Sequence, residues 1–463
     1  MAKSLNVSLE QLTITQQEAL DKLKSFVKSD KSCLNARSLA PIGALKDTPS
    51  DNAGSHRFFR LSGYAGTGKS FLICHLIKWL ADLEFAFVAA APTNKAAKSL
   101  KQLAISVGIT IDVKTVAQLL GQQPEINEET GLEEFTINSN SDARFDDYEI
   151  IIIDEFSMIN RSNFDAIVDA IATTIDTKVI FVGDSAQLPP VKEDSPIVAT
   201  SKYIDSTATL NEIVRYDGEI AIAAEKIRSQ ERYKKTLYPF QSSEDRTIVC
   251  QPRKEWLETV TEYFSCDRYK LNPDYARILV WKNKTALAAN KFVRSRLWGK
   301  DAPTYVPGDR LIAKKPLFRP RPGQKGKNKW GVTINNSEEC TVTKPPSIKH
   351  LTFDKETYTC LSLPVVTDSG TPVLLSVLTE ESEQFKNDKI KYYGSKKQWN
   401  RYFDLSRMFD DVTYSYALTV HKAQGSNIDY VFLDTEDMKY CPDLQKMLYT
   451  ALTRTKIRAF IPI

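Results

Sequence analysis

The segment of residues 63–70 constrains the fold of this chain more than any other. It reads G-Y-A-G-T-G-K-S and fits the pattern G-x-x-x-x-G-K-[ST]. A short predicted strand at 58–61 precedes it, and a predicted apolar helix at 71–80 follows it. In that setting, backbone amides at the helix N-terminus point at phosphate oxygens. The segment therefore predicts an α/β domain that binds a nucleotide.

Two residues of this phosphate loop have specific expected roles. Lys69 would reach the β- and γ-phosphates, and the Ser70 hydroxyl would ligate Mg²⁺. The other loop residues expected to contact the nucleotide are Gly63, Ala65, Gly66, Thr67 and Gly68. We therefore expect ATP and Mg²⁺ as ligands.

A second strong pattern is a run of four isoleucines at 150–153, followed by Asp154 and Glu155. A buried strand here delivers two carboxylates at its carboxyl end, where α/β sheets bind ligands. Asp154 would hold Mg²⁺, and Glu155 would orient or deprotonate an attacking water. After a third apolar run at 178–182 comes Gln187, whose amide suits a hydrogen bond to a γ-phosphate.

Composition narrows the class of protein. A chain of 463 residues exceeds one ordinary core, so about two to four domains are expected. Apolar strands alternate with amphipathic helices, which predicts parallel sheets covered on both faces. The net charge of +4 allows a local nucleic-acid surface without requiring one. The seven cysteines contain no C-x-x-C pair, which argues against disulfides and a zinc site. No apolar stretch reaches the roughly 18 residues of a membrane span, so a soluble, cytoplasmic protein is expected.

The order of these motifs resembles superfamily 1 helicases of the 5′-to-3′ branch, superfamily 1B, which includes RecD and Pif1. Within that branch the likeness is greatest to the Dda helicases of T4-type phages. Beyond the three patterns above, the likeness rests on residues 12–20 (Q-motif), 91–97 (motif Ia), 114–116 (motif Ib), 210–215 (motif IV), 416–426 (motif V) and 448–454 (motif VI).

This resemblance implies further site residues. Gln16 would read adenine, and Gly425 would contribute to nucleotide binding. A second α/β domain would supply Arg215 and Arg454, since planar guanidinium donors suit a transferring phosphoryl group. Single-stranded DNA would lie across both domains. Its expected phosphate contacts are Thr93, Asn94, Thr115, His421, Lys422 and Ser426.

The resemblance also implies an organisation into two RecA-like domains with one insertion each. The first domain is expected at 1–120 and 148–204, with a pin-like hairpin at 121–147 that wedges a duplex open. The second is expected at 205–305 and 412–463. Its insertion at 306–411 would be an SH3-like β-barrel with a helical projection. The long loop at 29–56 has no predicted function.

The insertion carries a basic stretch with two aromatic residues. The cations are Lys314, Lys315, Arg319, Arg321, Lys325, Lys327 and Lys329, accompanied by Phe318 and Trp330. This combination suits single-strand binding by charge and stacking. A solvated loop explains the charges equally well, and the sequence leaves both interpretations open.

The expected activity is ATP-dependent unwinding of duplex DNA with 5′-to-3′ movement on single strands, in phage or bacterial replication, recombination or repair. The direction comes from the resemblance alone. The alternatives are a translocase or remodeller without robust unwinding, and an RNA helicase. Expected partners are single-stranded DNA, strand junctions and a single-strand-binding or replisome protein. A monomer is expected, because one chain holds both halves of the ATP site.

Overall fold

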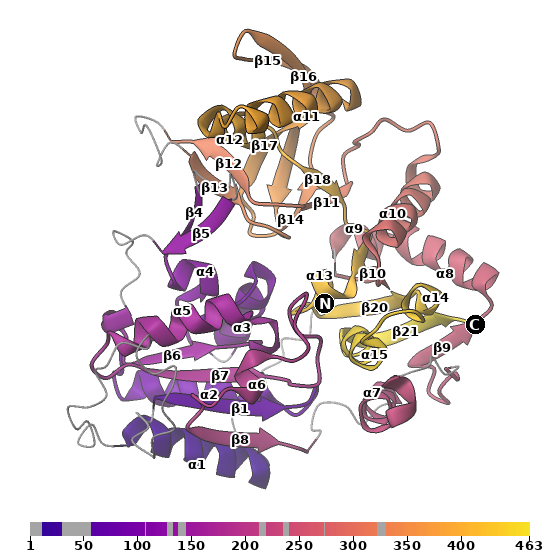
Figure 1. The fold of residues 1–463 in the computed structure, drawn as a ribbon. Coiled ribbons are helices and arrows are strands. Elements are labelled where there is room, and N and C mark those ends of the chain that lie inside the picture. The colour runs from indigo at the N-terminus through magenta and orange to yellow at the C-terminus, as the bar shows by residue number, and fades with distance from the viewer. Residues whose placement is uncertain are drawn as a thin grey trace.

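Three sheets organise the computed structural model, which describes residues 12–29, 57–106, 108–126, 133–137, 145–212, 219–234, 240–272, 274–321 and 330–463. Two are parallel and lie side by side, and the third is antiparallel and stands above them in the view of Figure 1. Among the described residues, no helix is both long and apolar enough to cross a membrane. The predicted loop at 29–56 lies, apart from Ser29, outside the described residues.

The first parallel sheet has the strand order β3-β2-β6-β7-β1-β8. Its strands are β1 (Phe58–Gly63), β2 (Phe87–Ala91), β3 (Val113–Thr115), β6 (Ile150–Ile153), β7 (Lys178–Gly183) and β8 (Ser206–Leu210). Alternate isoleucines of β6 enter two separate cores, one on each face. A strand buried on both faces explains why its sequence is apolar without alternation.

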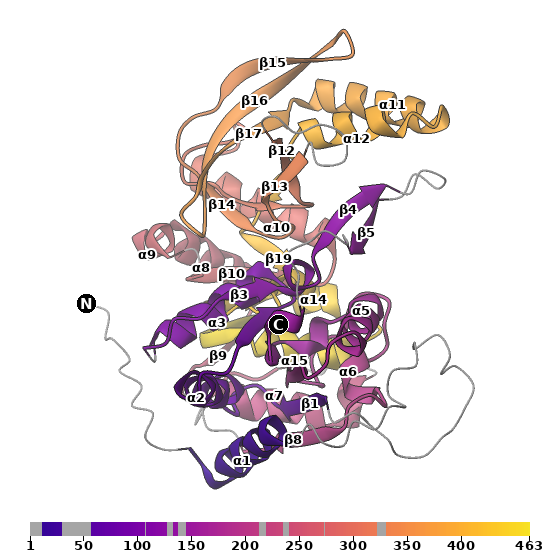
Figure 2. The ribbon, with the colours of Figure 1, turned by 90° about the vertical axis from the view of Figure 1, so that its left-hand side faces the viewer.

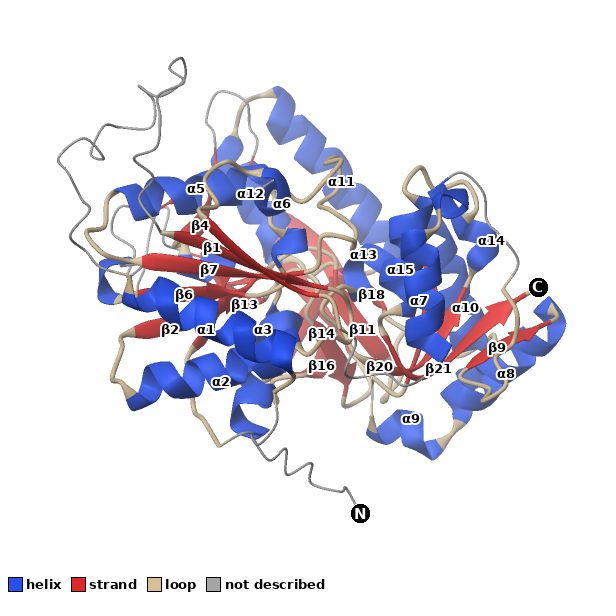
Figure 3. Ribbon diagram, turned by 90° about the horizontal axis from the view of Figure 1, so that it is seen from below, coloured by secondary structure: helices blue, strands red, loops and turns tan. Residues whose placement is uncertain are grey.

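Helices cover both faces of this sheet, as Figure 3 shows. One face packs against α1 (Ile14–Lys28), α2 (Lys69–Asp82) and α3 (Asn94–Ser106). The opposite face packs against α4 (Val116–Leu119), α5 (Arg161–Ala172) and α6 (Ile197–Thr200). The predicted strands and helices of this unit are therefore present.

The second parallel sheet has the order β19-β10-β20-β21-β9. Its strands are β9 (Ile248–Gln251), β10 (Ala276–Val280), β19 (Ala417–Thr419), β20 (Ile428–Leu433) and β21 (Thr455–Pro462). One face packs mainly against α7 (Glu219–Ser229), α13 (Val420–Ala423), α14 (Thr435–Met438) and α15 (Leu444–Leu452). The other packs against α8 (Arg253–Ser265), α9 (Asp267–Leu271) and α10 (Asn283–Trp298).

The antiparallel sheet interrupts the second one in sequence, between β10 and β19. It contains β11 (Arg310–Ala313), β14 (Glu339–Val342), β15 (Ser347–Phe353), β16 (Glu356–Thr367), β17 (Pro372–Leu378) and β18 (Val412–Tyr414). β18 lies beyond the predicted end of the insertion at 411 and pairs with β11. A three-residue strand carries no pattern that assigns it to one sheet rather than the other.

Two helices and two hairpins complete the structure. The predicted helical projection is formed by α11 (Glu380–Ser395) and α12 (Trp399–Met408), which pack on the outer part of β16 around buried aromatic side chains. One hairpin joins β12 (Leu317–Pro320) and β13 (Trp330–Ile334). The other joins β4 (Gln122–Ile126) and β5 (Glu133–Ile137) and extends from the first unit toward β12 and β13 (Figure 2). The predicted fold class is confirmed: two parallel α/β sheets, a hairpin in the first unit, and an antiparallel half-barrel with helices in the second.

Candidate active site between the two parallel sheets

The phosphate loop connects β1 to α2 through a backbone path that needs glycine. Gly66 and Gly68 have φ angles of 84° and 78°, in the left-handed region that glycine adopts without steric cost. A Cβ on Gly63 would lie 2.6 Å from Thr67 Oγ1. The loop therefore closes tightly before α2 begins at Lys69, and the free amides of that helix end suit an anion.

The Lys69 side chain is held by backbone carbonyls of the phosphate loop. The ammonium donates to the carbonyls of Gly63 at 2.6 Å and Tyr64 at 3.0 Å. Ser70 is the next residue of α2 and is half-buried. The predicted phosphate-binding lysine and metal-binding serine thus stand side by side at the start of one helix.

Gln16 is joined to the phosphate loop rather than turned outward. Its Oε1 accepts from the backbone amide of Thr13 at 3.0 Å, and its Nε2 donates to the Thr67 carbonyl at 3.1 Å. A Cβ on Gly68 would lie 2.4 Å from Nε2. Gln16 therefore supports the loop as well as capping α1. Its expected contact with adenine stays a prediction.

The two predicted catalytic carboxylates follow β6 directly. Glu155 has a φ of 55°, a conformation that is uncommon outside glycine and often marks functional sites. The backbone amide of Glu155 donates to Asp154 Oδ1 at 2.9 Å. Burial, and next the charge of Glu155, raise the pKa of Asp154 to about 7. A bound cation would favour the ionised form of this carboxylate.

The donor set fits Mg²⁺, although the protein supplies few ligands. Ser70 and Asp154 offer the hydroxyl and carboxylate oxygens that hard cations prefer. Within the described ranges, no three His, Cys, Asp or Glu residues gather to form a metal site of their own. Few protein ligands are typical where phosphate oxygens and water complete the Mg²⁺ shell.

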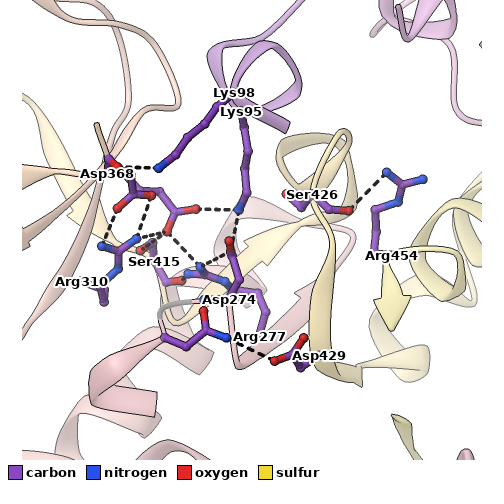
Figure 4. A network of polar contacts seen from close by, with 12 residues as sticks. Lys95, Lys98, Asp274, Arg277, Arg310, Asp368, Ser415, Ser426, Asp429 and Arg454 are labelled. Carbon is purple, nitrogen blue, oxygen red and sulfur yellow. Dashed lines mark hydrogen bonds and ion pairs between the residues drawn. The ribbon is translucent and has the colours of Figure 1, made fainter. Parts of the chain in front are cut away.

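Arg454 brings the second sheet into this site. It follows α15, is buried, and its Nη1 lies 4.0 Å from Glu155 Oε1. The same Nη1 donates to the carbonyl of Ser426 at 3.4 Å (Figure 4). The structure thus brings together the predicted carboxylate of one sheet and the predicted arginine of the other. The second predicted arginine, Arg215, lies outside the described residues.

Gln187 and Gly425 occupy the same contact between the units. Gln187 is buried, and its Oε1 has no hydrogen-bond partner among the residues described. An unpaired buried acceptor in a native fold calls for a functional explanation. Gly425 has a φ of 73°, and a Cβ there would lie 3.0 Å from Ala96 Cβ. A side chain here would be strained and would crowd Ala96, so glycine favours this close approach of the second unit to α3.

The sequence did not single out three further residues that hold the units together here. Gln424 Nε2 donates to the Leu188 carbonyl, and the Leu188 amide donates to Thr450 Oγ1, both at 2.9 Å. The hydroxyl of Tyr449 accepts from the backbone amide of Ala65 at 3.0 Å. Gln424 lies within the segment matched to motif V, and Tyr449 and Thr450 lie within the segment matched to motif VI, which is the signal that was available for finding them.

The predicted nucleic-acid contacts from the first unit cap helices. Thr93 Oγ1 accepts from the Ala96 amide at 3.2 Å, and Thr115 Oγ1 accepts from the Gln118 amide at 3.1 Å. Both are N-cap interactions, which threonine commonly makes. Asn94 begins α3 and is half-buried. Phosphate contacts from these side chains stay predictions.

The predicted contacts from the second unit differ in exposure. His421 and Lys422 lie half-buried on α13. Burial lowers the pKa of both, and the nearby charge of Lys314 lowers that of Lys422 further. The side chain of Ser426 is only 1% exposed. Ser426 is therefore enclosed by the protein, and a phosphate would reach its side chain only after this segment moved.

A network of charges that is buried around Glu339 joins α3 to the other two sheets (Figure 4). Lys95 Nζ contacts Asp274 Oδ1 at 3.0 Å and Glu339 Oε1 at 3.3 Å. Glu339 Oε2 also accepts from Arg277 at 3.0 Å and Arg310 at 3.1 Å. Burial by itself would raise the pKa of Glu339, but these three cations outweigh it and hold the pKa well below its ordinary value.

The described cations of the basic stretch mostly have protein partners. Lys314 pairs with Asp411 at 2.7 Å and Arg319 with Asp410 at 2.8 Å. Lys315 donates to the Ser406 carbonyl at 3.3 Å. These partners are distant in sequence. The sequence of the stretch therefore shows positive charges without acidic neighbours, although the fold neutralises several of those charges. Lys325, Lys327 and Lys329 lie outside the described residues.

The two aromatic residues of the basic stretch serve the fold. Phe318 is buried beneath the guanidinium of Arg407, whose Cζ lies 4.9 Å from the ring centroid. Trp330 Nε1 donates to Asp404 Oδ1 at 2.7 Å. Both residues therefore contact α12, and the buried Phe318 ring is not displayed for base stacking.

Comparisons with known proteins agree with this geometry. Two family models match the chain: an AAA domain over residues 51–243 and a UvrD-like helicase C-terminal domain over residues 414–461. The "Uncharacterized protein R530" of Acanthamoeba polyphaga mimivirus is 24% identical over 474 residues, covering 88% of this chain and 95% of that protein. The "ATP-dependent DNA helicase dda" of Enterobacteria phage T4 is 23% identical over 432 residues, covering 86% and 93%.

A solved structure shares the fold over nearly the whole chain. It is described as "Structural Basis for DNA Unwinding at Forked dsDNA by two coordinating Pif1 helicases". The TM-score is 0.51 at 16% sequence identity, and the match covers 98% of this chain and 92% of that one. The two chains therefore share a fold over nearly their whole lengths.

Proposed function

We propose that this chain, a superfamily 1B helicase by its motifs, relatives and fold, is an ATP-dependent DNA helicase that moves 5′ to 3′ on single strands and unwinds duplex DNA. One observation carries the proposal: Arg454 of the second unit lies 4.0 Å from Glu155 of the first. A site assembled from two units changes its shape when its ligand changes. That property turns hydrolysis into relative motion.

The residues divide the chemistry of hydrolysis between them. The loop amides and Lys69 hold the phosphates, and Ser70 with Asp154 would hold Mg²⁺, which stabilises charge on the phosphoryl oxygens when bound. Glu155 orients a water whose oxygen attacks the γ-phosphorus while the bond to the β–γ bridging oxygen breaks. Glu155 accepts the proton of that water. The products are ADP and phosphate.

Gln187 and Arg454 act on the γ-phosphate from opposite units. The amide of Gln187 donates to a γ-phosphate oxygen, and the guanidinium of Arg454 stabilises the charge that develops on the transferring group. Release of phosphate removes the anion that both side chains contact. The two units then separate, and the next ATP draws them together again.

The track is single-stranded DNA across the carboxyl ends of both parallel sheets. Thr93, Asn94 and Thr115 would contact phosphates from one unit, and His421 and Lys422 from the other. Such contacts position the strand without reading its sequence. The hairpin of β4 and β5 would act as the wedge. We propose the domain boundaries expected from the sequence, with β18 added to the antiparallel insertion. We also propose that the protein is a monomer. It would work with single-strand-binding or replisome proteins in replication, recombination or repair.

The test is unwinding of two partial duplexes, one with a 5′ single-stranded tail and one with a 3′ tail, with ATP and Mg²⁺. Opening of the 5′-tailed duplex alone, abolished in Lys69→Ala, is the expected result. DNA-stimulated ATP hydrolysis with neither duplex opened would replace the proposal with a translocase or remodeller. Unwinding of RNA duplexes in preference to DNA would replace it with an RNA helicase.

A further inference from the structure

Tyr449 makes two hydrogen bonds that join parts of the site on different units. It lies on α15, is 2% exposed, and accepts from the Ala65 amide at 3.0 Å. Its own hydroxyl donates to Asp184 Oδ2 at 2.6 Å. Burial, and next the charge of Asp184, raise the pKa of Tyr449. The hydroxyl therefore keeps its proton and always has it available for Asp184.

Asp184 links Tyr449 to the loop that carries Gln187. The carboxylate is fully buried, and its second oxygen, Oδ1, accepts from the Ala186 amide at 2.9 Å. The backbone amide of Gln187 donates to the backbone carbonyl of Asp184 at 3.3 Å. With both carboxylate oxygens engaged, the loop is folded around Asp184. The position of Gln187 consequently depends on where Asp184 is held.

The same helix also determines where Arg454 lies. Thr450, the neighbour of Tyr449, accepts from the Leu188 amide at 2.9 Å, and its carbonyl accepts from Arg454 Nε at 3.3 Å. Arg454 is therefore tied to the last turn of α15. A shift of α15 relative to the phosphate loop moves Arg454 together with Tyr449.

We propose that Tyr449 is a positioning residue for ATP hydrolysis: its hydroxyl fixes the phosphate loop, the Gln187 loop and Arg454 in one mutual arrangement. It acts through Ala65 and Asp184 and does not touch the reacting atoms. Gln187 and Arg454 then meet the γ-phosphate at the same time. This inference rests on the proposed function, because it assigns a role within that same site.

Replacing Tyr449 with phenylalanine isolates the hydroxyl from the ring. The ring packs in the core between α15 and the second sheet, and Tyr449→Phe keeps that packing. The change leaves Asp184 Oδ2 and the Ala65 amide without their partner. We expect kcat for DNA-stimulated ATP hydrolysis to fall about 10- to 100-fold, as misplaced catalytic groups do. KM for ATP should change by less than about threefold, because phosphate-loop binding is retained.

Tyr416→Phe is the matched control. The Tyr416 hydroxyl donates to Asp309 Oδ1 at 2.7 Å, and the residue is 1% exposed. It belongs to the same unit and makes the same type of buried bond, but to Asp309 of the second unit rather than to a residue of the first. Denaturant unfolding should show similar losses of stability for the two variants, while kcat falls only in Tyr449→Phe.

A binding ratio separates positioning from general damage. ADP with aluminium fluoride mimics the transferring phosphoryl group, whereas ADP alone does not reach Gln187 or Arg454. The wild type and Tyr416→Phe should bind the fluoride complex much more tightly than ADP, and Tyr449→Phe should lose most of that preference. A double variant with Asp184→Asn should be little worse than either single variant, because both interrupt one connection.

The outcomes are distinct. An unchanged kcat and an unchanged binding ratio in Tyr449→Phe would overturn the inference, and so would equal losses in Tyr416→Phe. If Tyr449→Phe does not fold, Asp184→Asn gives the same test, because an amide offers one acceptor where the carboxylate offers two. Absence of ATP hydrolysis in the wild type would instead overturn the proposed function.

Discussion

Two of the contacts between the first unit and the rest of the molecule, both among the described residues, are built from different interactions. Beside the phosphate loop and the Gln187 loop, Tyr449, Thr450 and Gln424 make mostly uncharged hydrogen bonds to backbone atoms, and the Tyr449 hydroxyl also donates to Asp184. At α3, Lys95 reaches a network of buried ions centred on Glu339. An uncharged hydrogen bond contributes only about 1 kcal/mol to stability, so such bonds break and re-form at little cost. Removing one partner of a buried ion pair destabilises the fold strongly, because the other charge stays buried without its counter-charge.

This difference indicates a division of tasks. The first contact surrounds the predicted catalytic residues, where the proposed function requires the two units to approach and separate in each cycle. Glu339, Arg277 and Arg310 all belong to the second unit and its insertion, so their mutual pairing is independent of that movement. Lys95 adds a partly exposed ion pair from the first unit. We therefore expect changes at the first contact to alter catalysis and changes at the second to alter stability.

Glu155→Gln tests the catalytic side and should have the largest effect. Loss of the residue that orients and deprotonates water should lower kcat by about 10²–10⁴-fold, with ATP affinity and unfolding free energy retained. Steady-state hydrolysis and equilibrium nucleotide binding measure the two quantities. Glu149→Gln, just before β6, is the control and should remain active. Hydrolysis within a few-fold of wild type would remove Glu155 from the proposed mechanism.

Glu339→Gln tests the stability side. It leaves Arg277 and Arg310 buried without their shared counter-charge, and breaking such a pairing costs about 3–5 kcal/mol. Urea unfolding measures the loss. Glu338→Gln, its half-buried neighbour, should cost far less. The comparison would fail if Glu339→Gln kept full stability and lost catalysis in the folded protein.

The pH dependence of stability sharpens the same comparison. The pKa of Glu339 is lowered in the folded protein, so its stabilisation is fully present above the unfolded-state pKa of about 4.3. It is lost as pH falls from there through the folded pKa. Between pH 6 and 3, the wild type should therefore lose more unfolding free energy than Glu339→Gln. Parallel pH profiles of unfolding free energy for the two proteins would contradict the stabilising role of the Glu339 carboxylate.

Lys95→Met should have the smallest effect. The Lys95 side chain is 23% exposed, and Glu339 keeps both arginines when it is removed. We expect a loss of about 1 kcal/mol, measured by urea unfolding at low and high salt. The loss should shrink at high salt because the pair is partly screened. Lys98→Met, on the same helix, provides the comparison. A loss as large as that of Glu339→Gln would place the centre of the network at α3 instead.

Local patterns predicted the parts of the site that lie close together in sequence. The phosphate loop and the carboxylates after β6 each belong to one strand and the residues that follow it, so periodicity and glycine placement suffice to find them. The basic stretch shows where this reasoning ends. Lys314 and Arg319 have no acidic neighbour in sequence, yet Asp411 and Asp410 pair with them in the fold.

By itself, the sequence determined the class of fold, the phosphate loop, the paired carboxylates and the likeness to superfamily 1B helicases, because each depends on contiguous residues. Only the tertiary structure decided that Arg454 faces Glu155, that Tyr449 bonds the phosphate loop, and that Glu339 sits among three cations. These partners are separated by long stretches of chain. Sheet order and packing brought them together, and neither is written in the local spacing of residues.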